Sequence, residues 1–497
     1  MKKYFVYSVF IVFFITLILT GVVLFRTEQA LWKKATPAKG KESISLADKQ
    51  EYAQRLAKAL TFKTISFQEA EKNNWEEYKN FIQYLEETFP QVHTTLKRDI
   101  VNEYSLLFTW EGKNPSISPA LFLAHYDVVP VEQETEDQWK YPPFAGVVAE
   151  DYIWGRGAID VKCGVIGLLE SVNYWVQQGY QPERTLLFAF GHDEEVGGRN
   201  GAKKIAELLK ERGMFPEFSL DEGMAINEGI IPGIDSPVAL IGIAEKGYLS
   251  LELSVTTQGG HSSVPTDKTA IGILANAICK IEQNPMPAKL AGPMRWMLED
   301  LSPYMNFHMR MVCANLWLFE SILTNIFSSI PNADAALRTT FAPTLFHAGE
   351  KENVLPTNAR TVINIRLFPG DTTEKVTEYI RKIINNNRIQ IKQFSPEKTD
   401  EASPVSDRNG EGYKAITNTI REVWGDIPIA CALTLGGTDS VNYVGVAKNL
   451  YRFQPLKFTS EDLKLIHGIN ERLQIDNYMN GIEFYIRILK NVGKLSP

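Results

Sequence analysis

Short apolar runs that alternate with helical patterns constrain the fold of this chain more than any other feature. Three runs cover residues 120–124, 186–190 and 218–220, and each is bounded by polar or turn residues. Apolar residues at helical spacing fill the intervals, for example over 165–176 and 202–209. This alternation predicts an α/β domain with a mainly parallel sheet, whose ligands bind at the carboxyl ends of the strands.

A change of pattern indicates a second domain. Apolar and polar residues alternate from Tyr248 onward and again over 362–367, as in half-exposed strands. We therefore expect a smaller α+β domain at 248–367. It would be inserted into the α/β domain, which covers 46–247 and resumes over 368–497.

The N-terminus differs in kind, because residues 4–25 form an uncharged and almost entirely apolar run. A helix of this length reaches about 33 Å, enough to cross a hydrocarbon core of about 30 Å. The run is longer than the apolar part of a cleavable signal peptide, roughly 7 to 15 residues, and no A-x-A-like site follows it. We predict an uncleaved transmembrane anchor, a polar tether at 26–45 and a folded part on the extracytoplasmic side. Secretion after signal cleavage is the alternative.

Charge and cysteine spacing argue against two kinds of binding site. The net charge of −7 and the lack of a basic patch argue against a nucleic-acid partner. The four cysteines show no CxxC spacing, so a cysteine zinc cluster is not expected. With 44% hydrophobic and 22% charged residues, most of the chain is able to bury a core.

Metal-binding side chains follow the predicted strands. His125 ends an apolar run, and Asp127 points to the same face, because residues i and i+2 of a strand share a face. Asp127 can therefore hold the imidazole in a metal-binding tautomer. Asp160 follows a glycine-punctuated turn just before a helix, where its carboxylate can bridge two cations. Taken alone, His125 fits a structural histidine as well as a ligand, and Asp160 fits a helix N-cap better than a ligand.

Further acids follow the later strands. Three consecutive acids, of which the last two are Glu194 and Glu195, precede a pair of glycines. Carboxylates confined in one loop repel each other unless a cation or full solvation offsets the repulsion. One of them can bind a metal ion while its neighbour takes a proton from the attacking water. Asp221 and Glu222 follow another short strand, and His467 is isolated near the C-terminus.

Together these motifs resemble the aminoacylase and carboxypeptidase S family of dinuclear zinc hydrolases. The shared motifs, in the family's order and spacing, are His125-x-Asp127-x-x-Pro130, Asp160-x-Lys162, Glu194-Glu195, Asp221-Glu222-Gly223 and His467-x-x-Asn470-Glu471. The resemblance covers nearly all of the chain after the tether. It implies a zinc-peptidase-like catalytic domain and a ferredoxin-like inserted domain that serves as a lid or for dimerisation. It also implies an amidohydrolase that cleaves, or in reverse forms, an amide bond next to a free carboxylate.

The resemblance also implies roles for the metal-site residues. Two zinc ions per chain would be held by His125, Asp160, Glu195, His467 and Asp221, with Glu222 as the alternative to Asp221. Asp160 would bridge the two ions. Glu194 would be the general base, and Asp127 would support His125.

Substrate contacts are implied in the same way. His261 matches the histidine that stabilises the oxyanion, often across a homodimer interface. Asn353 and Arg366 match positions that face the substrate, and a guanidinium suits a planar carboxylate. Gly437 and Thr438 match a turn that approaches the free carboxylate. A surface salt bridge for Arg366 and an ordinary turn at Gly437 are the alternatives.

The anchor, the size and the segment Asn315-Leu-Trp317-Leu-Phe-Glu320 most resemble carboxypeptidase S and the N-fatty-acyl-amino-acid synthases/hydrolases. The expected substrates are therefore long-chain N-acyl amino acids. A carboxypeptidase or dipeptidase, and more remotely a non-catalytic membrane-anchored receptor, are alternatives. Residues 294–330 are dense in Trp, Met, Phe and Leu, which predicts a groove for the acyl chain. A domain core, a dimer interface or a membrane contact would explain the same density.

Overall fold

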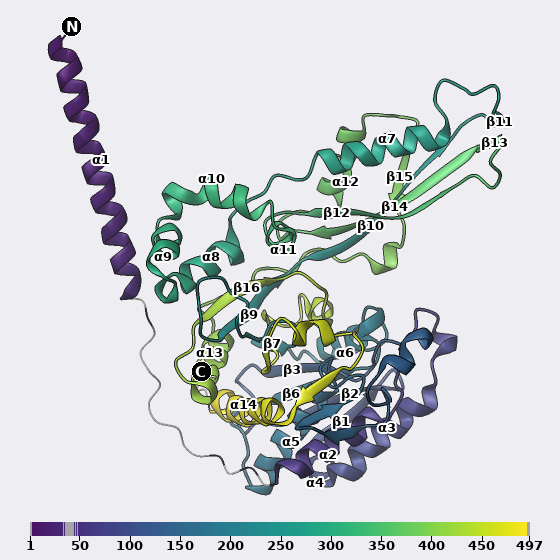
Figure 1. Ribbon diagram of the computed structural model, residues 1–497. Coiled ribbons are helices and arrows are strands. Elements are labelled where there is room, and N and C mark those ends of the chain that lie inside the picture. The colour runs from purple at the N-terminus through teal and green to yellow at the C-terminus, as the bar shows by residue number, and fades with distance from the viewer. Residues whose placement is uncertain (1, 33, 35–43, 45, 47, 495–497) are drawn as a thin grey trace.

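The computed structural model describes residues 2–32, 34, 44, 46 and 48–494. Two larger sheets organise this part of the chain: a ten-stranded mixed sheet and a four-stranded antiparallel sheet that projects from it (Figure 1). Helix α1 (Lys2–Leu31) extends away from both sheets (Figure 1). The chain thus has an α/β body, a projecting arm and an N-terminal helix.

The ten strands of the large sheet are β1 (Lys97–Val101), β2 (Ser105–Trp110), β3 (Ala120–His125), β6 (Leu186–Gly191), β7 (Phe218–Asp221), β8 (Ile226–Asn227), β9 (Val238–Glu245), β16 (Ile429–Thr434), β17 (Asn449–Arg452) and β18 (Lys457–Phe458). Their order is β1-β2-β6-β3-β7-β17-β9-β8-β18, with β16 also paired to β9. The four neighbours β6, β3, β7 and β17 run parallel. The predicted α/β class is confirmed, and the three predicted apolar runs are the buried strands β3, β6 and β7.

Helices cover both faces of this sheet because alternate strand residues point to opposite faces. Phe122 and Phe188 face a core that includes α2 (Lys49–Leu60), α3 (Trp75–Thr88), α4 (Pro90–Thr95), α5 (Lys162–Gln177), α13 (Glu411–Trp424) and α14 (Ile475–Gly493). Leu121 and Leu187 face the opposite core, which contains α6 (Ala202–Glu211). A separate three-stranded sheet joins β4 (Val147–Ala149), β5 (Tyr152–Trp154) and β19 (Arg472–Gln474).

The projecting arm consists of β10 (Gly247–Thr256), α7 (Ala270–Gln283), β12 (Thr340–Ala348), β14 (Asn358–Leu367), α12 (Thr373–Ile384) and β15 (Gln390–Gln393). The strand order β12-β14-β10-β15 and the sequence β-α-β-β-α-β are those of a ferredoxin-like unit. The predicted end of the inserted domain at residue 367 would leave α12 and β15 outside the arm. However, β15 pairs with β10, and α12 packs in the same core as α7. We therefore propose a boundary after β15.

Four helices between α7 and β12 form a layer of their own. They are α8 (Gly292–Leu301), α9 (Phe307–Ala314), α10 (Leu316–Phe327) and α11 (Pro331–Ala335). Leu298 and Leu301 of this layer share a core with Leu240 of β9 and Ala432 of β16. The layer therefore packs on the edge of the large sheet, although the sequence assigned it to the inserted domain.

Helix α1 is longer than the predicted anchor. It continues to Leu31, so the first residues of the predicted tether are helical, whereas residues 35–43 of the tether lie outside the described residues. Its last turns pack against α9 and the short helix Ser302–Tyr304. Residues 7–31 are long and apolar enough to cross a membrane, and an N-terminal signal sequence has the same properties.

Candidate metal centre

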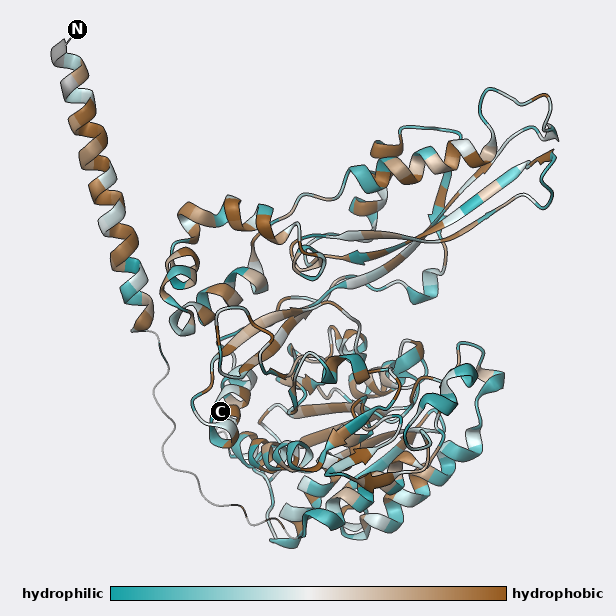
Figure 2. Ribbon diagram, in the orientation of Figure 1, coloured by the Kyte–Doolittle hydropathy of each residue, from teal (hydrophilic) through white to brown (hydrophobic). Residues whose placement is uncertain are grey.

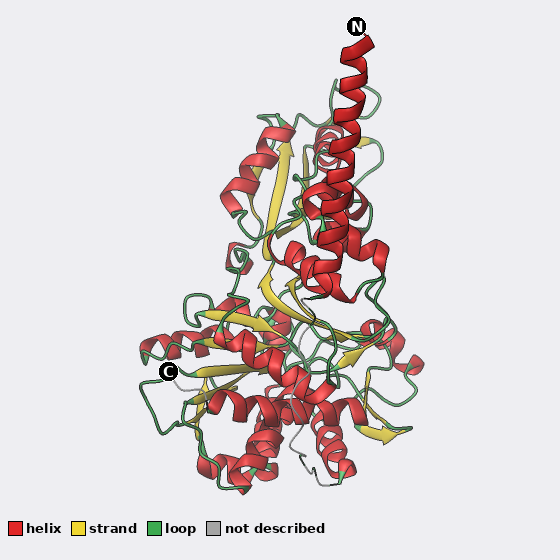
Figure 3. Cartoon of the chain, turned by 90° about the vertical axis from the view of Figure 1, so that its left-hand side faces the viewer, coloured by secondary structure: helices red, strands yellow, loops and turns green. Residues whose placement is uncertain are grey.

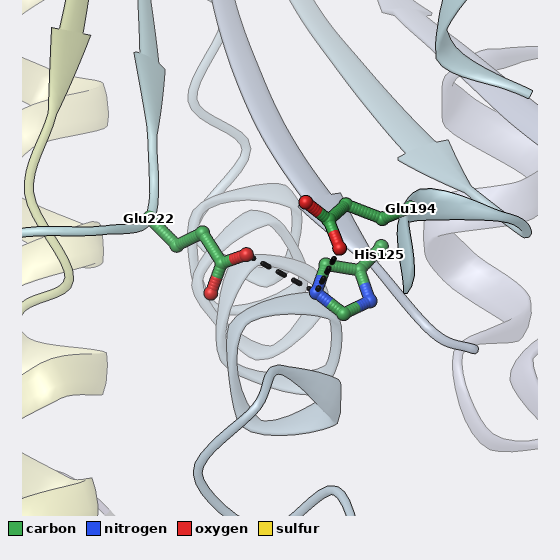
Figure 4. A group of neighbouring side chains, drawn as sticks. All are labelled: His125, Glu194 and Glu222. Carbon is green, nitrogen blue, oxygen red and sulfur yellow. Dashed lines mark hydrogen bonds and ion pairs between the residues drawn. The ribbon is translucent and has the colours of Figure 1, made fainter. Parts of the chain in front are cut away.

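The carboxyl ends of three neighbouring strands bring the predicted ligands together. His125 is the last residue of β3, Glu194 and Glu195 begin the turn after β6, and Glu222 follows β7. These ends meet at one edge of the sheet because β6, β3 and β7 are adjacent and parallel. Figure 4 shows Glu194 and Glu222 directing their carboxylates toward the imidazole of His125.

Asp160 links this group to His467. Nε2 of His467 lies 3.0 Å from Oδ2 of Asp160 and 3.2 Å from Oε2 of Glu195. Nε2 of His125 lies 3.1 Å from the other oxygen of Asp160, Oδ1. The small sheet helps to set this geometry, since β19 follows the His467 loop and pairs with β5 just before the Asp160 turn. Asp160 thus offers one oxygen to each histidine, as a bridging ligand would.

Glu222, and not Asp221, faces this cluster. Oε1 of Glu222 lies 3.1 Å from Nε2 of His125. Oδ2 of Asp221 accepts hydrogen bonds from the backbone N–H and the hydroxyl of Ser440, both at 2.8 Å. Oδ1 of Asp221 accepts the N–H of Glu222 at 2.9 Å. Both oxygens of Asp221 accept hydrogen bonds from the protein itself. We therefore propose Glu222 as the metal ligand, in place of Asp221, which the sequence favoured.

Asp127 lies buried beside His125 and ties the cluster together. Its Oδ1 lies 3.2 Å from Nδ1 of His125, and its Oδ2 accepts the hydroxyl of Ser66 at 2.6 Å. The backbone N–H groups of Glu194 and Glu195 also donate to it, both at 3.1 Å. Burial opposes its charge, but these donors hold the pKa of Asp127 below its ordinary value. One carboxylate therefore orients a predicted ligand and fixes the acidic loop.

Glu471 stabilises the turn that contains Asp160 through hydrogen bonds, a role that the sequence did not reveal. Its Oε1 accepts three backbone N–H groups of the turn, including that of Asp160, at 2.8–3.3 Å. Its Oε2 accepts Nη1 of Arg156 at 2.6 Å, and the same guanidinium donates to the carbonyl of His467 at 3.0 Å. The position of Glu471 beside His467 and the glycine pair around Arg156 were the available signals.

The electrostatics of the cluster favour a cation. Burial and the nearby Asp160 raise the pKa of Glu222 to about 7, and burial raises the pKa of Glu194 well above its ordinary value. Hydrogen bonds with Asp160 and Glu195 raise the pKa of His467 to about 10. Confined carboxylates of this kind are stabilised either by protons or by bound cations.

The donor set fits a divalent metal ion. In two groups, His125 with Glu194 and Glu222, and His125 with Asp160 and Glu195, the possible ligand atoms lie within 4.8 Å of one another. Oε1 of Glu195 is buried without a hydrogen-bond partner, which leaves a lone pair for a metal. Imidazole and carboxylate are ligands that zinc accepts in catalytic sites.

A cavity of about 460 Å³ opens onto the cluster. Arg366, Gly437 and Thr438 line it together with the acids and His467, so these predicted substrate contacts share one space with the metal centre. The hydroxyl of Thr438, however, donates to the buried Glu245 at 2.8 Å. The side chain of Thr438 therefore stabilises its own turn through this hydrogen bond.

His261 and Asn353 lie elsewhere in the same chain. His261 ends β11 (Gly260–His261) and Asn353 directly precedes β13 (Val354–Leu355), at the far tip of the arm (Figure 1). His261 is exposed, and its Nδ1 lies 2.7 Å from the hydroxyl of Ser263. The carbonyl of Asn353 accepts the N–H of Ser262 at 3.1 Å. The structure thus brings His261 and Asn353 near each other but not into the cavity.

Comparisons with known proteins identify the family of this chain. The model of Peptidase family M20/M25/M40 matches residues 121–491. The chain belongs to this peptidase family. The family resemblance predicted from the motifs is therefore confirmed.

Relatives of this M20 family member cover most of its length. It is 41% identical over 457 residues to "Probable carboxypeptidase S-like 2" of Dictyostelium discoideum, covering 91% of this chain and 87% of that protein. It is 38% identical over 448 residues to "N-fatty-acyl-amino acid synthase/hydrolase PM20D1" of Xenopus tropicalis, covering 89% and 86%. The solved M20 family metallo-carboxypeptidase Sso-CP2 of Sulfolobus solfataricus shares its fold, with a TM-score of 0.64, 16% identity and coverage of 90% and 100%.

The predicted acyl groove in residues 294–330 stays a prediction. None of these residues lines the cavity at the metal centre. Their buried side chains, such as Leu298 and Leu316, form a core with the edge of the large sheet. A space of about 350 Å³ between this layer and α1 has mixed walls, with charged residues such as Arg295 and Glu299 and apolar residues such as Leu316 and Trp317. The high apolar density therefore reflects packing and an exposed surface of α10.

Proposed function

We propose that this M20 family member hydrolyses, and in reverse forms, the amide bond of long-chain N-acyl amino acids at two zinc ions per chain. The observation that carries the proposal is the shared cavity: it joins the carboxylate and histidine cluster to the guanidinium of Arg366. An amide-cleaving centre and a group that binds a free carboxylate thus lie in one space. The PM20D1 relative, named for fatty-acyl amino acids, supports the choice of substrate.

The carboxypeptidase alternative has its own support. A relative with 41% identity is named as a probable carboxypeptidase S-like protein, and a peptide's C-terminal carboxylate would suit Arg366 equally well. A non-catalytic receptor is disfavoured, because every metal-binding position and Glu194 are present.

Arg366 is the cation available to a substrate carboxylate. Arg199, Lys246 and Lys398 also line the cavity, but each donates to oxygens of the chain itself. The guanidinium of Arg366 lies 4.9 Å from the ring centre of Tyr248 and forms no hydrogen bond or ion pair within the described part of the chain. Stacked in this way, it can donate two parallel hydrogen bonds to a carboxylate.

Glu194 is the proposed general base. A bound metal would polarise the scissile carbonyl and lower the pKa of water. Oε2 of Glu194 lies 3.9 Å from Nε2 of His125, beyond hydrogen-bond distance, and its carboxylate faces the cavity. It can accept a proton from water and deliver it to the leaving nitrogen. Asp127 keeps His125 and the Glu194 loop in place during these transfers.

We further propose that His261 and Asn353 complete the cavity of a second copy in a homodimer. Their place at the arm's tip separates them from their own cavity, and Oδ1 of Asn353 is buried without a hydrogen-bond partner. His261→Ala is expected to lower kcat by about 10² to 10³ with little change in KM, because an oxyanion donor acts mainly in the transition state. An unchanged kcat with a raised KM would assign His261 to ordinary substrate binding.

Mixed dimers test the source of His261. A Glu194→Gln chain supplies His261, and a His261→Ala chain supplies Glu194, so a mixed dimer has one complete site. Random mixing of these inactive variants is expected to restore about a quarter of wild-type activity, since half of the dimers are mixed. Failure to regain activity despite subunit exchange would show that each chain uses its own His261.

The substrate class is tested by acyl length. We expect kcat/KM to rise from acetyl to oleoyl on one amino acid, phenylalanine, because each buried methylene contributes about 0.8 kcal/mol. The assay uses detergent below its micellar concentration, with a dipeptide as the control substrate. A profile that is flat or falls with length, together with faster cleavage of the dipeptide, would favour the carboxypeptidase alternative.

For location, we propose that α1 is a transmembrane anchor with the catalytic body on the extracytoplasmic side. Its described side chains from Tyr4 to Val22 are exposed, as expected for a helix that lipid surrounds. Secretion after signal cleavage is the alternative, and the mass of the mature N-terminus distinguishes the two.

A further inference from the structure

Helix α10 carries large apolar side chains on its exposed side as well as on its buried side. Leu316 and Leu323 are buried in the core shared with the large sheet. Leu318, Ile322 and Ile326, four residues apart, are 46%, 56% and 50% exposed. We call these three side chains the outer face of α10; Figure 2 shows the ribbon of this helix largely in the hydrophobic colour. A surface helix of a soluble protein normally carries polar residues opposite its buried stripe, whereas α10 exposes these three large apolar side chains together with the small polar Ser321 and Asn325.

The start of α10 is fixed beside α1. Asn315, just before α10, is fully buried, and its Nδ2 donates to the carbonyl of Val23 at 3.2 Å and to Oγ1 of Thr27 at 3.3 Å. Val23, Thr27 and Ala30 are the buried side chains of α1 among the described residues. The contact between α1 and the helical layer therefore begins at Val23.

This contact lies near the end of the exposed apolar part of α1, which continues to Leu24 and Phe25. At about 1.5 Å per residue, residues 4–25 reach about 33 Å, enough for a hydrocarbon thickness of about 30 Å. If residues 4–25 cross a bilayer, its surface lies near Phe25, within one helical turn of Val23 and its contact with Asn315. This step rests on the proposed anchor.

The outer face of α10 is turned toward the same side. In Figure 1, α8 lies between α10 and the large sheet, and α1 projects beyond α10 in the opposite direction. The view turned by 90° also shows the helical layer beside the lower part of α1 (Figure 3). The charged residue of α10, Glu320, is paired with Arg295 at 2.9 Å. Trp317, 45% exposed, is a residue type that favours the membrane interface.

We propose that the outer face of α10 lies in the interface of the lipid bilayer, as a second membrane contact beside α1. Two separated contacts fix the orientation of the catalytic body relative to the membrane, which one helix with a tether does not. The partner is a phospholipid surface, because the apolar side chains continue from the exposed part of α1 at the same level.

Lipid-borne quenchers test this contact in the full chain. The parent carries Cys279→Ser, since Cys279 is the exposed cysteine and Cys163, Cys313 and Cys431 are buried. An environment-sensitive fluorophore is attached at Ile322→Cys or Ile326→Cys in phosphatidylcholine nanodiscs with or without doxyl-labelled lipid. Leu17→Cys reports on the anchor, and Phe215→Cys, 50% exposed on the catalytic body, is the control.

We expect at least about twofold quenching at Ile322→Cys, Ile326→Cys and Leu17→Cys, and none at Phe215→Cys. Quenching at Leu17→Cys alone would overturn the inference and leave the anchor intact. Quenching at α10 alone would refute the anchor and therefore overturn the inference of a second contact beside it. No quenching at any position would overturn both. A shielded fluorophore on α10 that lipid does not quench would show that a second copy covers the face, which also overturns the inference.

Discussion

Replacement of Glu194 by glutamine is expected to lower kcat/KM by about 10² to 10⁴ while the bound metal is retained. The amide has the shape of the carboxylate but cannot accept the proton of water. The neighbouring structure should persist, because Asp127 holds this loop through the backbone N–H of Glu194 and not through its side chain. Kinetics on N-oleoyl-phenylalanine and the metal content of the same sample are the measurements.

Glu195→Gln is the matched control at the next position. Oε2 of Glu195 lies 3.2 Å from Nε2 of His467, so we expect this variant to lose activity by losing metal. More than about a tenth of wild-type kcat/KM in Glu194→Gln, a loss under about 1.4 kcal/mol, would contradict the role of base. Loss of metal from Glu194→Gln would instead make Glu194 a ligand.

A second pair of variants separates Glu222 from Asp221. Glu222→Gln is expected to lower the metal content from two ions to one and kcat/KM by about 10²-fold or more, because an amide oxygen is a weak zinc ligand. Asp221→Asn is expected to keep both ions, with an effect of about 10-fold, since its oxygens support the chain through Ser440. Metal analysis after dialysis against metal-free buffer measures the difference. The reverse pattern would restore Asp221 as the ligand.

The ligand set comes from the resemblance of local motifs to the family, which assigns a role to each residue. The structure adds the reason why they meet: His125 ends β3, Glu195 follows β6, and these parallel neighbours place their ends together. The choice between Asp221 and Glu222 is different. β7 ends at Asp221, so strand alternation no longer decides which carboxylate faces the site. The decision depends on Ser440, far away in the chain.

Long-range contacts also explain the other differences between the expectations from the sequence and the structure. β15 belongs to the arm because it pairs with β10, which no local pattern of β15 indicates. The density of residues 294–330 was visible in the sequence, but density alone does not tell which surfaces the side chains meet. In the structure Leu316 faces a core, and Asn315 reaches Val23 of α1. A buried acid such as Glu471, which supports a turn through backbone donors, leaves no periodic signal.

We propose that Asp160 would bridge two metal ions, because its two oxygens face His125 and His467 separately. The metal content of the purified, active full chain, determined by elemental mass spectrometry, tests this proposal. We expect two zinc ions per chain in the wild type and the loss of both in Asp160→Asn. Full hydrolytic activity in a wild-type chain that holds one metal ion or none would contradict it.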